Sequence, residues 1–260
     1  MSLDLYAGPL WRFYTRDFET PQQRMAREQG LEHRFIYDGE PIPWPDIATC
    51  KASLSGLQAD IGANLNIAPA DCWNEDCETY HTEQLLDDAR AALALVSAYM
   101  YRPELRRPDR MPDDIETDPA YSEAPEKGYL VGLIASFEAT LWLPCLSEEL
   151  VFVTDPMEWR FLTTGLTRLE SGLATLKREI WNGKTDVDAW LERGAAPGRG
   201  WSEKKVINPE TGAEEWVTER EEEAENSVLW NAEYGFAVFS KALDFARTHN
   251  VPIRTNNVFE

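Results

Sequence analysis

YLVGLIASFEATLWLPC, residues 129–145, is the most apolar stretch of the chain and indicates where its core lies. Large apolar side chains recur in it at helical spacing, and small residues fill positions between them. The stretch is shorter than a membrane span, carries Glu138 near its middle and stops at Pro144. We therefore expect a buried helix over about 129–143, with a globular domain packed around it.

The C-terminal part of the chain predicts a second buried helix, over about 219–249. Its apolar residues cover much of the helix circumference, which is typical of a helix inside a domain. The two helices would be the main elements of the core. Glu138 falls at the edge of the first apolar stripe, so we expect a boundary residue paired with an arginine and not a catalytic acid.

Short strands complete the prediction, which is a predominantly helical α+β fold. Near the N-terminus the pattern predicts a β–α–β unit, in which Thr20 caps a helix that starts at Pro21 and ends at Gly30. Strands are expected at 3–6, 31–37 and 150–153, and a hairpin at 204–217. Further helices are expected over about 45–61, 82–100 and 162–180, with Thr82 capping the second.

The chain is expected to form a single domain, 1–260. Its composition changes to proline and acid between residues 102 and 127, which predicts a long loop and a possible internal linker. The absence of a basic segment followed by an apolar run at the N-terminus predicts no signal peptide, and the few cysteines do not make a disulfide scaffold. We expect a cytoplasmic protein.

The net charge of the chain limits its partners. The sequence holds 46 acidic and 25 basic residues, a formal net charge of −21 at pH 7. Such a charge repels nucleic-acid phosphates and anionic lipid surfaces, so we predict binding to neither. The charge serves solubility, or it attracts a basic partner protein.

Four residues could form a structural zinc site: Cys50, Cys72, Cys77 and His81. Thiolates and imidazole are the ligands that zinc prefers. The C-x₄-C-x₃-H spacing of the last three is a poor match to structural zinc loops, which usually begin with two to four residues between cysteines. We therefore favour ordinary reduced thiols, with zinc as the alternative, and expect no other cofactor.

The sequence gives no catalytic residue. It contains no nucleophile elbow, phosphate loop, dinucleotide-binding fingerprint or zinc-protease motif. Carboxylates are so abundant that any pair of them carries little information. Catalytic residues therefore stay unassigned, and a hydrolase that uses carboxylates or a metal is one open alternative.

The densest charge lies where the last helix is expected to begin. We assign a partner-binding face to these acids and to two nearby tryptophans, because aromatic anchors are common in interface hot spots. The residues are Glu219, Glu221, Glu222, Glu223, Glu225, Trp201 and Trp216. The alternative is a solvated helix N-terminus stabilised by the helix dipole.

The whole chain resembles an uncharacterised family of soluble bacterial proteins. The resemblance lies in the opening LDLYAGPLWRFYTRDFET, the Trp73–Glu75 element, a leucine-rich helix that ends near Trp181, and the closing GFAVFSKALDFARTHNVPI. It implies one unit over most of the chain, but no activity. Cys72 and Cys77 do not belong to the family pattern, which counts against zinc.

Three functions remain open from the sequence. The first is an acidic protein that acts by protein–protein binding, for example an immunity protein that neutralises a secreted toxin, by analogy of charge and size. The second is a hydrolase with a carboxylate or metal centre. The third is a structural or regulatory component of an oligomer.

Overall fold

The computed structural model describes residues 2–31, 45–124, 132–154, 160–196, 201–207, 214–220 and 226–256. Within these residues the chain forms a six-stranded mixed sheet, a separate two-stranded sheet and a larger number of helices. The predicted fold class, a predominantly helical α+β fold, is confirmed. None of the described helices is both long and apolar enough to cross a membrane.

The six-stranded sheet has the order β2-β1-β8-β3-β5-β4. All neighbouring strands are antiparallel except β3 and β5, which are parallel. The first and last described strands in sequence, β1 and β8, therefore lie side by side in the interior of the sheet. The bounds are β1 Ser2–Ala7, β2 His81–Leu86, β3 Leu141–Leu143, β4 Val151–Thr154, β5 Arg160–Gly165 and β8 Ile253–Asn256.

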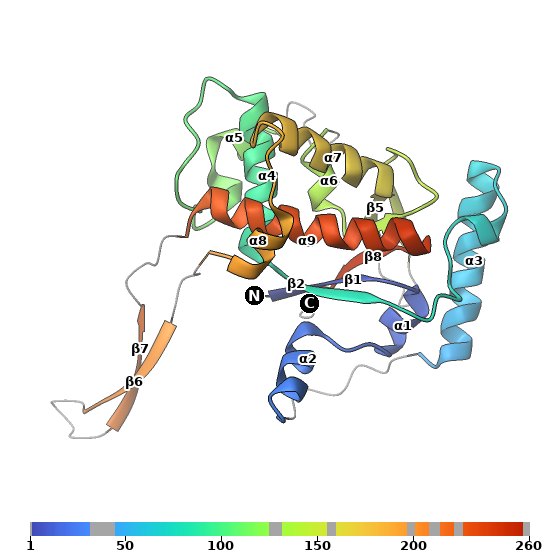
Figure 1. Cartoon of the computed structure of the whole chain (residues 1–260), viewed down its shortest axis with the longest axis horizontal. Coiled ribbons are helices and arrows are strands. Elements are labelled where there is room, and N and C mark those ends of the chain that lie inside the picture. The colour runs from blue at the N-terminus through green and yellow to red at the C-terminus, as the bar shows by residue number, and fades with distance from the viewer. Residues whose placement is uncertain are drawn as a thin grey trace.

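Three helices form the main layer on one face of this sheet. The longest, α9 (Val228–His249), contacts β1, β2 and β8. The other two, α4 (Asp87–Tyr101) and α7 (Leu166–Glu179), pack against α9. Figure 1 shows α9 between the sheet and these helices. The larger hydrophobic core fills this layer.

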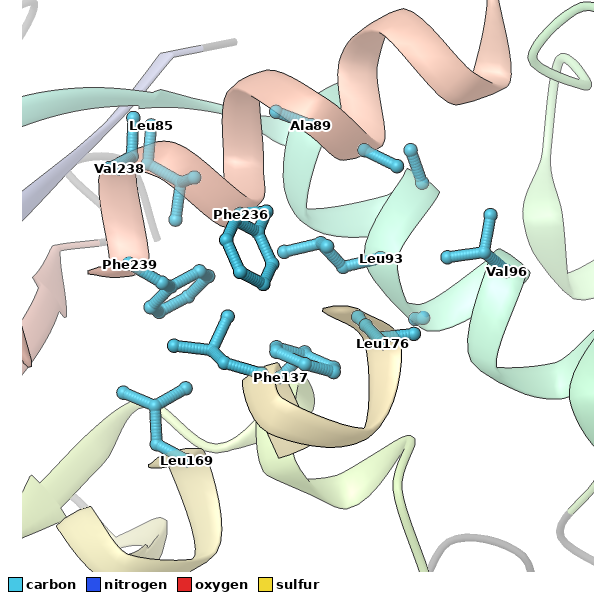
Figure 2. Close-up of a cluster of buried hydrophobic side chains, with 14 of the residues drawn as sticks. Leu85, Ala89, Leu93, Val96, Phe137, Leu169, Leu176, Phe236, Val238 and Phe239 are labelled. Carbon is cyan, nitrogen blue, oxygen red and sulfur yellow. The ribbon is translucent and has the colours of Figure 1, made fainter. Parts of the chain in front are cut away.

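The larger core is closely packed where α9 meets α4. Figure 2 shows Phe137, Phe236 and Phe239 converging between the helices, beside Leu93 of α4. Gly235 permits this approach, because a Cβ atom built there would lie only 2.7 Å from the Ala89 carbonyl oxygen. The glycine is therefore a packing residue in the middle of a helix.

The opposite face of the sheet carries the N-terminal helices. They are α1 (Leu10–Thr15), α2 (Pro21–Glu28) and α3 (Ile47–Leu65), of which α1 and α3 pack together and α2 contacts β2. A second, smaller core lies here and contains Tyr6, Phe13, Leu54, Trp73 and Leu141. In Figure 1, β1 and β2 run between α9 and the α1–α2 segment.

Shorter elements and one hairpin complete the structure. The short elements are the 3-10 turns η1 (Pro69–Asp71) and η2 (Ile115–Thr117), and the helices α5 (Pro119–Ser122), α6 (Ala135–Glu138) and α8 (Val187–Arg193). The hairpin consists of β6 (Trp201–Ile207) and β7 (Glu214–Arg220), which pair only with each other among the described strands. Figure 1 shows it standing away from the rest of the chain.

The predicted helix over 129–143 is wrong in its extent. Only Ala135–Glu138 is helical, and Leu141–Leu143 forms the strand β3 inside the sheet; residues 129–131 lie outside the described residues. All three β3 residues are buried, with Trp142 in the larger core and its two neighbours in the smaller one. A strand buried on both faces is apolar at every position, so its pattern cannot be told from that of a buried helix.

Other predicted boundaries also change. The last helix begins at Val228 and not near 219, because Glu214–Arg220 is the second strand of the hairpin. His81–Leu86 is a strand, so Thr82 does not cap α4, which begins at Asp87. The strands at 3–6 and 150–153, the hairpin at 204–217 and the Thr20-capped helix are confirmed. The strand predicted at 31–37 lies almost wholly outside the described residues.

Candidate functional site

The site begins with Glu75, which holds the start of α1. Its Oε1 accepts a hydrogen bond from the Leu10 N–H at 3.0 Å, and its Oε2 accepts one from the Trp11 N–H at 3.1 Å. The Trp73 indole N–H also donates to Oε1. Burial raises the pKa of this carboxyl, while the three donors oppose the rise. Both oxygens are thus engaged by structural N–H groups.

The turn between α1 and α2 is fixed to the edge of the sheet. Thr20 and Gln23 form a capping box, in which each side chain accepts a hydrogen bond from the other residue's N–H. Just before it, the Glu19 N–H donates to the Tyr80 hydroxyl at 3.0 Å, and the Glu19 carbonyl accepts from Thr82. The backbone of the turn therefore has a defined position beside Tyr80 and β2.

A shallow cleft of about 490 Å³ lies along this turn. We call it the arginine–aromatic cleft. Its lining residues are Arg12, Arg16, Asp17, Phe18, Glu19, Gln23, Arg27, Leu31 and Tyr80. Three arginines and two acids give this surface a local excess of positive charge, although the formal net charge of the chain is −21.

Aromatic rings hold the cations of the cleft in place. The Arg12 guanidinium carbon lies 4.8 Å from the centroid of the Trp11 ring and 5.9 Å from that of Tyr80. That of Arg16 lies 5.6 Å from Phe13 and 5.9 Å from Phe18. A guanidinium over a ring face is attracted by the ring quadrupole, so these side chains lose part of their freedom before any ligand arrives.

The acids of the cleft pair with two of its arginines at the surface. Arg12 Nη1 lies 2.8 Å from Asp17 Oδ2, and the Asp17 side chain is 53% exposed. Arg27 Nε lies 2.7 Å from Glu19 Oε1, and this pairing lowers the pKa of Glu19. A guanidinium has five N–H donors, so a single carboxylate does not saturate it. Arg12 Nε is buried and has no hydrogen-bond partner among the described residues.

A buried arginine connects the cleft with the sheet. Arg254 of β8 is only 3% exposed, and its guanidinium carbon lies 3.5 Å from the centroid of Phe161 and 5.5 Å from that of Phe13. Phe13 therefore has cations near it from both Arg16 and Arg254. Phe13 thus links Arg16 of the cleft with Arg254 of the sheet.

The predicted zinc ligands do not form a site in the described part of the chain. No group of three or more His, Cys, Asp or Glu side chains there could hold a metal ion. The Cys77 thiol instead donates to the Thr79 carbonyl, and His81 stacks on Phe245. The Cys72 thiol donates to the Gln58 carbonyl oxygen at 3.5 Å.

The predicted partner-binding face is described only in its backbone. Trp201 is the first residue of β6, and Trp216 pairs with Lys205 of β6. Because 201 and 205 share a face of the ribbon, the register places both tryptophan positions on that face. Glu219 lies in β7 opposite Ser202, and Glu221–Glu225 lies outside the described residues.

Glu138 is half-buried, as expected for a boundary residue, but the nearby Arg90 donates to its main-chain oxygen and not to its carboxylate. Arg90 of α4 donates hydrogen bonds to the main-chain oxygens of Phe137, Glu138 and Ala139. The Glu138 carboxylate interacts with the Tyr121 hydroxyl, whose pKa is raised to about 12, chiefly by burial. Arg90 therefore closes the end of α6 before the chain enters β3.

Comparisons of the chain with models of protein families, with curated proteins and with solved structures found no match. The resemblance to a family of bacterial proteins therefore stays a prediction.

Proposed function

We propose that this chain acts by binding another protein, and that the arginine–aromatic cleft receives a segment of the partner that presents a carboxylate. The observation that carries the proposal is the composition of the cleft. Arginine, tyrosine and tryptophan are the residues most enriched in interface hot spots. Here Arg12, Arg16, Arg27 and Tyr80 line an open cleft, and the Arg12 guanidinium lies near the rings of Tyr80 and of the neighbouring Trp11.

The shape of the cleft favours a protein over a small molecule. Small-molecule sites are usually enclosed, mostly apolar, and cover most of the ligand surface. This cleft is shallow, and charged side chains provide most of its lining. An extended segment anchored to a larger partner would gain contacts beyond the cleft, which a free small ligand would not.

A carboxylate is the group that best matches the donors present. Arg27 uses its Nε and Nη2 atoms on Glu19, and Arg12 uses Nη1 on Asp17. In each pair at least one of the two side chains is more than half exposed. Exposed ion pairs contribute little to stability. An incoming carboxylate can therefore share or replace these acids at small cost. An apolar neighbour of that carboxylate would contact Phe18 and Leu31.

Charge acts differently at long and short range. The net charge of −21 influences a partner during approach, so a partner that is basic overall would associate fastest. The cleft acts only at contact, since screening limits exposed charges to about 8 Å at physiological salt. We therefore propose a basic partner with one carboxylate-bearing contact segment. A secreted toxin that this chain neutralises is one member of that class.

Panning of a displayed library of short random peptides against the full immobilised chain tests the cleft. We expect enrichment of peptides that contain Asp or Glu next to an apolar residue. Their affinity should fall at least about tenfold in the double variant Arg16→Gln/Arg27→Gln, which corresponds to about 1.4 kcal/mol. The measurement is fluorescence polarisation with synthetic copies of the enriched peptides.

Arg178→Gln is the matched control variant. The Arg178 side chain is 67% exposed and paired with Glu179, much as that of Arg27 is 64% exposed and paired with Glu19. The control should keep full affinity. Enriched peptides that lack acids, or that bind the double variant as well as the wild type, would show that the cleft is not the binding site.

A further inference from the structure

A cavity of about 340 Å³ lies where α4 and α7 end. We call it the α4–α7 cavity. Its lining residues are Val96, Tyr99, Met100, Pro103, Leu105, Arg107, Glu179 and Ile180. Most of this lining is apolar or aromatic, and Met100, Leu105 and Ile180 pack against the larger core. The volume lies within the range of about 300–1,000 Å³ that is usual for small-molecule sites.

The loop that lines this cavity is held in place at both ends. Arg102, just after α4, pairs with Glu123, and its carbonyl oxygen accepts a hydrogen bond from the Leu105 N–H at 3.0 Å. Further along, the Met111 N–H donates to the Asn226 carbonyl oxygen at 2.8 Å. The residues between these anchors therefore have a defined position against the ends of α4 and α7, so the cavity is preformed.

Arg107 brings a positive charge to this largely apolar cavity. Its side chain is half-buried, and burial lowers the pKa of its guanidinium. Its charged neighbour in the described part of the chain is Asp109, but that carboxylate is 88% exposed and lies 3.5 Å from Arg106. Arg107 therefore gives up part of its hydration, and the described residues offer its guanidinium no hydrogen bond in return. A carboxylate is the group that best compensates such a guanidinium.

Negative charge meets the same cavity at Glu179, the last residue of α7. One oxygen of this carboxylate lies 2.5 Å from Arg178 Nε, and the Glu179 side chain is 48% exposed. A carboxylate accepts several hydrogen bonds, so Glu179 can also accept one from a ligand. Both α4 and α7 end at the cavity, and the dipole of a helix favours a positive charge at its C-terminus. A ligand cation is therefore favoured here beside a ligand carboxylate.

We propose that the α4–α7 cavity binds a free amino acid with an apolar side chain. The carboxylate of the amino acid accepts hydrogen bonds from Arg107, its ammonium group donates to Glu179, and its side chain contacts the apolar part of the lining. The Tyr99 hydroxyl already donates to Asp118 at 3.0 Å, so Tyr99 offers its ring. A fatty acid would leave Glu179 and the two helix ends without a cation, and a simple amine would leave Arg107 without a carboxylate.

Isothermal titration calorimetry of the full chain with L-phenylalanine, L-leucine and L-serine tests the proposal. We expect the first two to bind and L-serine to bind at least about tenfold more weakly, because it lacks the apolar side chain. Two further probes test the charges. The compound 3-phenylpropanoate lacks the ammonium group, and 2-phenylethylamine lacks the carboxylate. Each should bind at least about tenfold more weakly than L-phenylalanine, since each loses a charge-assisted hydrogen bond.

Arg107→Gln should weaken the binding of L-phenylalanine at least about tenfold. Arg106→Gln is the matched control, because Arg106 is the neighbouring residue, is 89% exposed and does not line the cavity. It should keep full affinity. Glu179→Gln changes an exposed side chain, so it tests the site even if Arg107→Gln does not fold, and it should also weaken binding.

Three results would overturn the proposal. The first is that neither L-phenylalanine nor L-leucine binds at millimolar concentration. The second is that 3-phenylpropanoate or 2-phenylethylamine binds as tightly as L-phenylalanine. The third is full affinity in both Arg107→Gln and Glu179→Gln. The arginine–aromatic cleft shares no lining residue with this cavity, so failure here leaves the peptide-binding proposal unaffected.

Discussion

His81 is a partly buried histidine whose surroundings oppose its protonation. It begins β2, opposite Ala7 of β1, and its ring lies 5.9 Å from that of Phe245 on α9. The Nε2 atom is buried and has no hydrogen-bond partner among the described residues. Burial lowers the pKa of His81 below its ordinary value of 6.5; nearby Glu83 opposes the shift, and Arg24 and Lys241 add to it.

This lowered pKa predicts a pH dependence of stability. The unfolded chain takes up the proton near pH 6.5, but the folded chain does so only at a lower pH, so the unfolded state binds more protons between the two values. The free energy of unfolding should therefore fall as the pH falls from 6.5 through the folded pKa, by up to about 1.4 kcal/mol per pH unit. His81→Phe should remove this part of the slope in urea unfolding measured from pH 7.5 to 5.5.

His249→Gln is the control for that measurement. His249 belongs to the same stack, since its ring lies 4.3 Å from that of Phe245. The variant should keep the slope that His81 causes. If His81→Phe and the wild type lose stability in parallel as the pH falls, the pH dependence arises elsewhere.

The contact of α9 with α4 depends on Gly235. In an exposed helix, alanine is more stable than glycine by about 1 kcal/mol. A methyl group at 235, however, would lie 2.7 Å from the Ala89 carbonyl oxygen and 3.0 Å from Leu93. We expect Gly235→Ala to destabilise the chain by about 1–3 kcal/mol, the usual cost of overpacking, as measured by urea unfolding.

Gly56 of α3 is the matched control for this prediction. It is exposed in the middle of a helix, and no atom lies within 4 Å of a Cβ built there. Gly56→Ala should therefore stabilise the chain by about 0.5–1 kcal/mol. If Gly235→Ala also stabilised the chain, α9 and α4 would be able to separate slightly at no cost in free energy.

Local sequence signals predicted the helices whose ends carry a capping residue, a proline or a glycine. Thr20 and Pro21 marked the start of α2, and Gly183 follows the helix expected to stop there. The apolar stretch at 129–145 correctly indicated the core but not its conformation, because burial on both faces removes the periodicity of a strand. Thr82 is a residue type that often caps helices, but it lies inside β2, which is followed directly by α4 at Asp87.

The candidate sites were harder to predict because folding assembles them from distant segments. Tyr80 joins the arginines of α1 and α2 only through the pairing of β1 with β2. Leu141 and Leu143 join the smaller core beside Tyr6 and Trp73 only because β3 lies inside the sheet. The sequence did show an aromatic group mixed with Arg12 and Arg16, but spacing alone gives no sign that these cations contact rings.

At the scale of the whole molecule, like charges repel in the folded chain. The formal net charge is −21, and folding brings these charges together. Raising the salt from about 0.01 M to about 0.1 M shortens the screening length from about 30 Å to about 10 Å. We expect sodium chloride to raise the thermal unfolding midpoint at pH 7.5 by a few degrees, roughly 1 kcal/mol for a chain of this size.

The same titration at pH 5 supplies the comparison. There the net charge is smaller, because part of the carboxylates are protonated, and the effect of salt should shrink. A midpoint that falls with added salt at pH 7.5 would show that local ion pairs, such as Arg247 with Glu170, outweigh the general repulsion.

The central position of β8 has a consequence for how the chain is made. The strand at 253–256 separates β1 from β3, so the β2–β1 part and the β3–β5–β4 part of the sheet are joined through it. Of the strands that the structure describes, a ribosome makes this one last. Until these residues emerge, β1 and β3 each present an unpaired edge that can recruit another chain or a chaperone. The sheet can therefore close only after residues 253–256 have left the ribosome.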